Sequence, residues 1–139
     1  EFGTEQEPAG KEAGFSGRRL ELKKGMCTMR AYESELSKTL IKIVESVPGT
    51  RIHGITDLDR LDERVPTVSF TVEGKDPERI ADEIGKHGIY VWNGHNYALA
   101  IVERMGLLEA GGMVRVGPVH YNTLDELEKF GEVLKKVAK

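Results

Sequence analysis

The sequence predicts an α+β domain: a small, mostly antiparallel sheet of three to four strands, helices packed mainly on one face, and a long N-terminal helix leading in. Apolar residues follow a helical period near both ends of the chain and a period of two in between. The resulting order is helix, strand, strand, helix, strand, short helix, strand, helix. The 139 residues, 39% of them hydrophobic, suit one domain with its own core.

The first helix is expected to begin near Leu20 and to end before the turn pair Pro48-Gly49. Its inner stripe has spacings of three and four. The stripe consists of Met29, Tyr32, Leu36, Leu40, Ile43, Val44 and Val47. Residues 1–17 are rich in glycine and charge and have no apolar period, so we expect a flexible lead or the remnant of an upstream domain there. Residues 18–139 are then the folded domain.

The middle of the chain alternates between strand and helix signals. Residues 51–53 are expected to be extended, and residues 57–63 to form a charged loop. Residues 68–72 alternate apolar and polar, which is typical of a strand with one buried face. Asp76-Pro77-Glu78 begins a helix that Gly88 is expected to close.

The last third adds two strands and two helices. Residues 89–92 are β-prone and precede an Asn93-Gly94 turn signal, and residues 98–105 favour a short helix ending at Gly106. Residues 113–116 predict another strand. Thr123 to Glu126 fits a capping box at the start of the final helix. The inner face of that helix is expected to hold Leu124, Leu127, Phe130, Leu134 and Val137.

Composition excludes several classes of function. Lys plus Arg number 20 against 23 for Asp plus Glu, a net charge of −3, so the chain has no basic field for nucleic acid. Cys27 is the only cysteine, which rules out an internal disulfide and zinc sites with two or more cysteines. The sequence contains no run of about 18 apolar residues, so it predicts no membrane span. A reducing, cytoplasmic compartment is expected.

Three polar residues are candidates for binding chemistry. Arg115 lies in an otherwise apolar strand and suits bidentate binding of a carboxylate or phosphate, or else it points to solvent or pairs with a glutamate. His95 follows a turn glycine, where it serves as a stacking or proton-transfer group or as an ordinary surface residue. His120 precedes a helix N-terminus, either at an anion site or in the turn that caps the helix.

Four segments between Arg64 and Thr123 carry a family resemblance. The segments are residues 64–70, 88–95, 114–117 and 120–123, the last ending in Tyr-Asn-Thr before the final helix. In order and spacing they resemble the C-terminal small domain of class V, fold-type I pyridoxal-phosphate enzymes, and within these the cysteine desulfurase-like group. With residues 32–54 included, the resemblance covers about three quarters of the chain.

The resemblance implies roles for individual residues. Arg115 takes the position of the arginine that binds the substrate α-carboxylate, and His95 and Asn93 fall where the family lines the cleft between its two domains. Thr4 matches, faintly, a threonine that meets the cofactor phosphate of the partner subunit. Tyr97 departs from the family, because cysteine desulfurases place their persulfide-forming cysteine there and a tyrosine cannot form a persulfide.

The resemblance also implies a larger enzyme. The family's Schiff-base lysine lies in an upstream large domain, and this chain has no Ser/Thr-x-His-Lys segment to supply it. The chain begins at Glu1 without an initiating Met, so we expect the tail of a homodimeric, pyridoxal-phosphate-dependent enzyme that acts on an amino acid. Alone it is expected to hold no covalent cofactor and to be inactive. The rival hypothesis is a non-enzymatic α+β ligand-binding or protein-interaction module.

Overall fold

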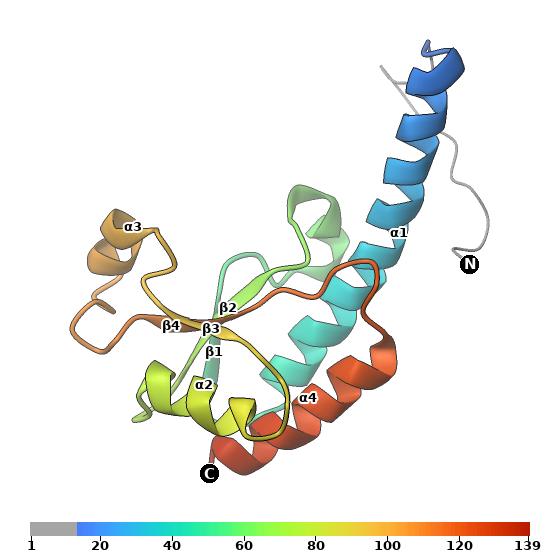
Figure 1. The fold of residues 1–139 in the computed structure, drawn as a ribbon. Coiled ribbons are helices and arrows are strands. Elements are labelled where there is room, and N and C mark those ends of the chain that lie inside the picture. The colour runs from blue at the N-terminus through green and yellow to red at the C-terminus, as the bar shows by residue number, and fades with distance from the viewer. Residues whose placement is uncertain (1–13) are drawn as a thin grey trace.

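The computed structural model describes residues 14–139, which form one four-stranded sheet and its flanking helices (Figure 1). The sheet order is β1-β2-β4-β3, and all three neighbouring pairs are antiparallel. The α+β class with a small antiparallel sheet is therefore confirmed. In chain order the elements are α1 (Gly17–Glu45), β1 (Thr50–His53), the 3-10 helix η2 (Leu58–Glu63), β2 (Val68–Val72), α2 (Pro77–Gly85), β3 (Trp92–Gly94), α3 (Leu99–Arg104), β4 (Met113–Val116) and α4 (Leu124–Val137).

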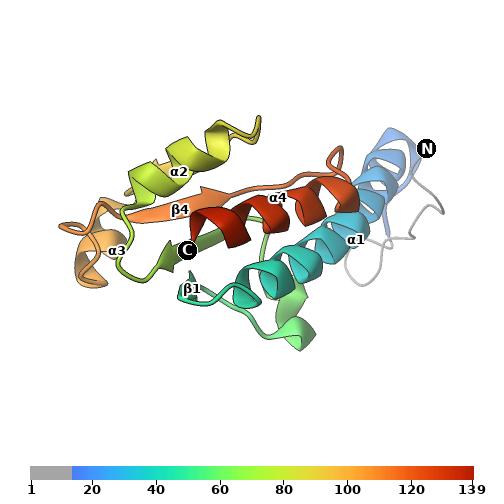
Figure 2. The same cartoon turned by 90° about the horizontal axis from the view of Figure 1, so that it is seen from below.

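The three longer helices α1, α4 and α2 cover the same face of the sheet (Figure 2). Strand β2 supplies the centre of the core, because its alternate residues Val68, Phe70 and Val72 are buried while Ser69 and Thr71 are not. Phe70 is fully buried, and Phe130 of α4 is 2% exposed. Other core residues are Leu36, Leu40, Ile41, Val44, Ile80, Ile84, Val114, Leu127, Val133 and Leu134.

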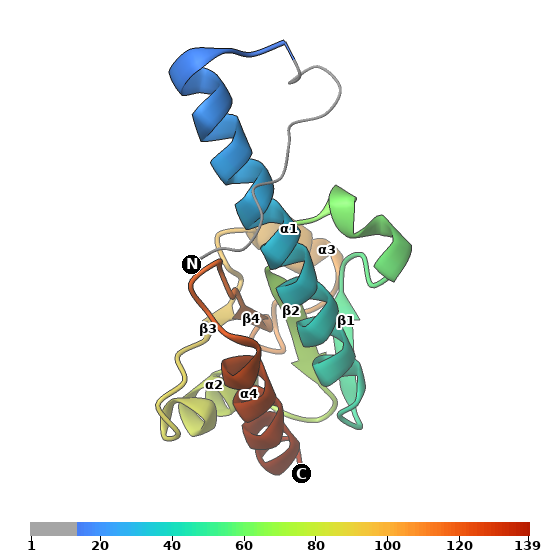
Figure 3. The same cartoon turned by 90° about the vertical axis from the view of Figure 1, so that its right-hand side faces the viewer.

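Helix α1 is packed only along its C-terminal half. Its buried residues begin at Leu36, whereas Leu22 and Met26 are each 60% exposed. Figure 3 shows the N-terminal half projecting past the rest of the domain. The predicted apolar stripe packs against other elements from Tyr32 onward, and the fully buried Ile41, which the predicted stripe omitted, packs with it.

Helices α1 and α4 approach closely at one glycine. A Cβ on Gly131 of α4 would lie 2.7 Å from Cγ2 of Ile43 on α1, so no larger residue fits without movement of one helix. The same helix begins with the predicted capping box, in which Thr123 and Glu126 satisfy each other's backbone N–H groups.

Three local expectations need correction. Residues 58–63 form η2, capped by the Asp57 side chain, rather than an irregular loop. The third strand lies at Trp92–Gly94 instead of residues 89–92, so Asn93-Gly94 is strand and not a turn. Helix α2 ends at Gly85, and Gly88 lies in the following turn with a φ of +74°. Periodicity placed these elements within a few residues, but pairing with β4 decided which residues of the third segment are strand.

Among residues 14–139, no helix combines the length and the apolar character that crossing a bilayer requires.

Candidate functional site

The face of the sheet opposite the helices carries the polar residues of the strands. Directly opposed residues of antiparallel strands point to the same side, so the register defines one row across all four strands. Ser69 of β2 lies between His53 of β1 and Arg115 of β4, and Arg115 is in turn opposed to Trp92 of β3. We call His53, Ser69, Arg115 and Trp92 the open-face row.

Arg115 is half-buried at the centre of this row. Within residues 14–139 it has no hydrogen-bond or ion-pair partner, and its neighbours in the row, Ser69 and Trp92, are uncharged. A half-buried guanidinium that has lost part of its water without gaining an acceptor favours the approach of an anion. Of the alternatives that the sequence left open for Arg115, pairing with a glutamate is not observed within residues 14–139.

The open face is positively charged along its strands. Arg51 lies on the same side as His53 in β1, and none of the four strands contains an acidic residue. Partial burial, followed by the charge of Arg51, lowers the pKa of His53 below its ordinary value. His53 Nε2 lies 3.0 Å from Thr71 Oγ1. His53 is therefore neutral near pH 7, and the positive charge of this face comes from its two arginines.

The loop after β3 places two more rings beside the row. His95 is exposed and its Nδ1 accepts a hydrogen bond of 3.2 Å from the backbone N–H of Tyr97. Tyr97 is 84% exposed, and its ring centroid is 6.3 Å from that of Trp92. Asn96 and Tyr97 both have positive φ, 53° and 60°; asparagine adopts this region readily, but it is unfavourable for the bulky Tyr97. Strain of this kind persists where the surrounding structure holds it, and it is frequent at functional sites.

Gly112 fixes the position of this loop. Its φ is +87°, and a Cβ built there would lie 2.2 Å from the carbonyl oxygen of Gly94. Only glycine allows the backbone before β4 to pass so close to the end of β3. The loop that carries His95 and Tyr97 is therefore attached directly to the edge of the sheet.

The structure brings together some of the predicted site residues and separates others. Arg115 lies on the open face, and His95 lies on the loop that leaves the neighbouring strand. Asn93 is opposed to Val114, a core residue, so its side chain is on the helix-covered side, away from Arg115. Thr4 lies outside the described residues.

Three members of the open-face row were not predicted as site residues. His53, Ser69 and Trp92 come next to Arg115 only because β4 inserts between β2 and β3. The alternation of β2 shows that Ser69 faces away from the core, which was the one available signal. Nothing in the local sequence states which strands are neighbours.

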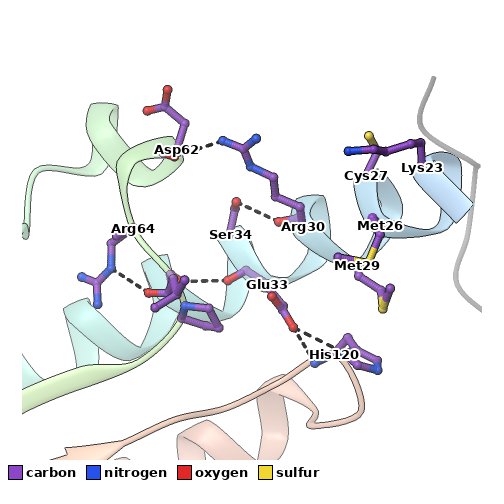
Figure 4. Close-up of a pocket in the computed structure, with 13 residues that line it drawn as sticks. Lys23, Met26, Cys27, Met29, Arg30, Glu33, Ser34, Asp62, Arg64 and His120 are labelled. Carbon is purple, nitrogen blue, oxygen red and sulfur yellow. Dashed lines mark hydrogen bonds and ion pairs between the residues drawn. The ribbon is translucent and has the colours of Figure 1, made fainter. Parts of the chain in front are cut away.

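A hollow of about 680 Å³ lies along α1 (Figure 4). None of the predicted substrate residues lines it. Of its charged groups, Arg30, Glu33 and Arg64 already have partners within the fold. Arg30 donates to the backbone carbonyl of Asp62 at 3.0 Å, and Glu33 Oε1 lies 3.3 Å from the backbone N and 3.4 Å from Nδ1 of His120. These contacts join η2 and the 119–122 turn to α1, so we assign this groove a structural role.

The turn that holds His120 caps α4. Asn122 Oδ1 accepts from the backbone N–H of Val119 at 3.0 Å, and the carboxylate of Glu126 accepts from Thr123 at 2.8 Å. That backbone hydrogen bond is the main reason why the pKa of Glu126 is lowered. The carboxylate of Glu126 thus already binds the backbone N–H at the N-terminus of α4. Of the two alternatives for residues 120–122, the structure shows the capping turn rather than an anion site.

The open face does not fit a covalently bound pyridoxal phosphate by itself. Its four strands contain no lysine, so they offer no amine for a Schiff base. In the part of the chain from residue 14 onward, no three His, Cys, Asp or Glu side chains are grouped to hold a metal ion. The chemistry that this face can perform is binding of an anion next to exposed rings.

Comparison with known proteins gives a consistent picture. A family model described as aminotransferase class-V matches residues 17–130. The aminotransferase-like protein FGM3 of Gibberella zeae is 36% identical over 108 residues, which make up 76% of this chain and 26% of that protein. A cysteine desulfurase of Synechococcus elongatus is 31% identical over 113 residues, 81% of this chain and 17% of that protein.

Solved structures agree with the sequence matches. The apo structure of a cysteine desulfurase from Thermococcus onnurineus NA1 superposes with a TM-score of 0.72 at 25% identity, covering 86% of this chain and 29% of that one. The chain therefore spans between 17% and 29% of the length of these relatives.

Proposed function

Since the chain belongs to the class-V aminotransferase family, we propose that it forms the substrate-side C-terminal domain of a cysteine desulfurase-like enzyme. The full-length enzymes of this family depend on pyridoxal phosphate, which supplies the electron sink for chemistry at the amino-acid α-carbon. The large domain that holds the cofactor, and the homodimer in which such a domain would act, are part of this proposal.

The unpaired guanidinium of Arg115 is the observation that carries the proposal. It is half-buried, it has no partner among residues 14–139, and it is flanked by uncharged neighbours on a face without acidic strand residues. A planar carboxylate satisfies two of its N–H groups at once. Arg115 would hold the α-carboxylate of the substrate and so fix the orientation of its α-carbon.

His95 is the second residue that we assign to the substrate. It is exposed on the loop that leaves β3, and its Nδ1 accepts from the N–H of Tyr97, so the neutral ring carries its proton on Nε2 and can donate from there. Asn93 is assigned no contact with substrate, because it faces the helix-covered side.

Persulfide chemistry is not part of the proposal. Tyr97 occupies the loop position where the resemblance places a cysteine. The only cysteine, Cys27, lies on α1 and lines the hollow along that helix. Without a thiol on this loop, the chain cannot accept sulfur from a substrate there. An aminotransferase-like reaction that leaves no sulfur on the protein is therefore the form that we propose.

Titration of ¹⁵N-labelled protein with L-alanine tests the role of Arg115. The side-chain Nε–Hε signal of Arg115 is expected to shift and saturate, because the carboxylate accepts from the guanidinium. L-alaninamide, which has the same amine but no carboxylate, is the matched ligand and should leave the signal in place. Equal shifts with both ligands, or none with L-alanine, would contradict carboxylate binding.

Catalytic inactivity of the chain alone is tested with the cofactor itself. Mixed with pyridoxal phosphate and reduced with borohydride, the chain should show no adduct at a specific lysine, because its open face offers no amine. A stoichiometric adduct at one lysine, found by peptide mass spectrometry, would show that the domain is an independent cofactor-binding protein.

A further inference from the structure

Trp92 and Tyr97 form an exposed pair of rings beside Arg115. Trp92 is 52% exposed and directly opposes Arg115, and the ring centroids of Trp92 and Tyr97 are 6.3 Å apart at an interplanar angle of 38°. We call these two rings the aromatic corner. Large aromatic side chains left this open on a fold with an otherwise well-buried core mark a place where something apolar binds.

The loop backbone that carries Tyr97 is held by hydrogen bonds within the loop. Tyr97 has a φ of 60°, and its N–H is bound to His95, while Ala98 N–H donates to His95 O at 2.8 Å. The carboxamide of Asn96 donates to Gly94 O at 3.2 Å, yet its Oδ1 is buried without a hydrogen-bond partner within residues 14–139. The positive φ of Tyr97 and the unsatisfied acceptor of Asn96 are both unfavourable for the free domain, and features of this kind cluster at functional sites.

We propose that the aromatic corner binds the aromatic side chain of an α-amino acid whose carboxylate is held by Arg115. The inference rests on the proposed function and names its substrate class. Opposed residues on antiparallel strands are about 4.5–5.5 Å apart. The side chains of Arg115 and Trp92 leave the same side of the sheet from Cβ atoms this close, so one ligand can contact both of them, with a carboxylate on Arg115 and a ring on Trp92.

An aromatic side chain fits better than a small one for two reasons. Two tilted rings leave open faces and edges that a third ring meets in offset or edge-to-face contact, the arrangements that aromatic groups prefer. A small side chain such as that of alanine would hold its carboxylate on Arg115 without reaching the second ring, and would leave both rings in water.

The intrinsic fluorescence of Trp92 reports on this site alone, because Trp92 is the only tryptophan in the chain. With excitation at the red edge of tryptophan absorption, L-phenylalanine and L-alanine are titrated into the whole 139-residue protein. L-phenylalanine should change the emission at roughly tenfold lower concentration than L-alanine. 3-Phenylpropionate should retain most of the affinity of L-phenylalanine, and phenethylamine, which lacks the carboxylate, should lose it.

Two variants and one control locate the effect. Tyr97→Asn removes the ring at a position with positive φ that asparagine tolerates, and should bring L-phenylalanine to the affinity of L-alanine. Arg115→Gln should weaken both ligands at least tenfold. The control is Tyr121→Asn, which removes a tyrosine of similar exposure, 77%. Tyr121 follows Arg115 in the sequence, whereas Tyr97 precedes it, and replacement of Tyr121 should leave both affinities unchanged.

The outcomes separate this inference from the proposed function. If L-alanine and L-phenylalanine bind equally and both depend on Arg115, the carboxylate site stands and the aromatic corner is refuted. If neither ligand changes Trp92 emission and neither moves the Arg115 Nε–Hε signal, both are refuted. A preference for L-phenylalanine that survives in Tyr97→Asn also overturns the role of the corner.

Discussion

The two faces of the sheet differ in polarity and packing although the same strands form them. The helix-covered face is apolar and closely packed around Phe70, Phe130 and Val114. The open face carries Arg115, which has no partner among residues 14–139, together with exposed rings and a loop in which Tyr97 has a strained positive φ. Alternation along a strand allows one segment to serve both faces, so residues adjacent in sequence are expected to differ sharply in what they contribute.

Replacement of neighbouring residues on β2 should give the largest contrast. Phe70→Ala deletes a fully buried ring and is expected to lower the free energy of unfolding by about 3–5 kcal/mol. Ser69→Ala, one residue earlier on the open face, should change it by less than about 0.5 kcal/mol. Urea unfolding followed by circular dichroism measures both. Similar losses for the two variants would show that the open face is part of the stabilising core.

Two glycines of the helical layer should respond in opposite directions to the same change. Gly131→Ala places a methyl group 2.7 Å from Ile43 Cγ2, and the resulting separation of α1 and α4 should cost about 1–3 kcal/mol. Gly25→Ala lies in the projecting half of α1, where no atom of residues 14–139 lies within 4 Å of the added Cβ, and should increase helical content and stability by up to about 1 kcal/mol. If Gly131→Ala stabilises the domain as much as Gly25→Ala does, the two helices are not closely packed there.

The helices and the central strands were predictable because their signals are local. The period of α1, the alternation of β2 and the capping box of α4 each lie within one segment and lead to the observed element. The third strand was misplaced because Trp92–Gly94 is strand only through its pairing with β4. Asn93-Gly94 is a strong turn signal by composition, and the pairing overrides it.

The candidate site was predictable only in part for a related reason. Arg115 stands out in the sequence as a charge inside an apolar strand, and the structure leaves it without a partner within residues 14–139. Its neighbours His53, Ser69 and Trp92 come from three other strands, and only the order β1-β2-β4-β3 brings them into one row. Asn93 was expected to line the cleft between the two domains together with His95; because a strand places successive residues on opposite faces, Asn93 lies on the helix-covered side and Trp92 on the open face.

A smaller effect is expected from the pH dependence of the open face. Because the pKa of His53 is lowered in the fold from its ordinary value of 6.5, the unfolded chain binds the proton more readily. The free energy of unfolding should therefore fall as the pH drops from 6.5 toward the lowered pKa. At pH values well above 6.5, His53 is neutral in both states and should contribute no pH dependence. The measurement is the shift in urea midpoint between about pH 7.5 and about pH 5.5.

His53→Gln is the matched variant for this pH effect, since glutamine retains a side-chain contact to Thr71 but does not titrate. Its midpoint should shift less between the two pH values than that of the unmodified protein. The remaining histidines, His87, His95 and His120, are common to both proteins and cancel in the comparison. An equal or larger shift in His53→Gln would remove His53 as the source.

The smallest effect on stability is expected at the residue that matters most for binding. Arg115 has no partner to lose within residues 14–139, so Arg115→Ala should leave the free energy of unfolding within about 0.5 kcal/mol of the unmodified protein. Equilibrium urea unfolding of this variant is the most direct test, because the assignment of Arg115 to a ligand requires that the fold does not depend on it. A loss of more than about 2 kcal/mol would show that the guanidinium holds the sheet together, and would contradict the account.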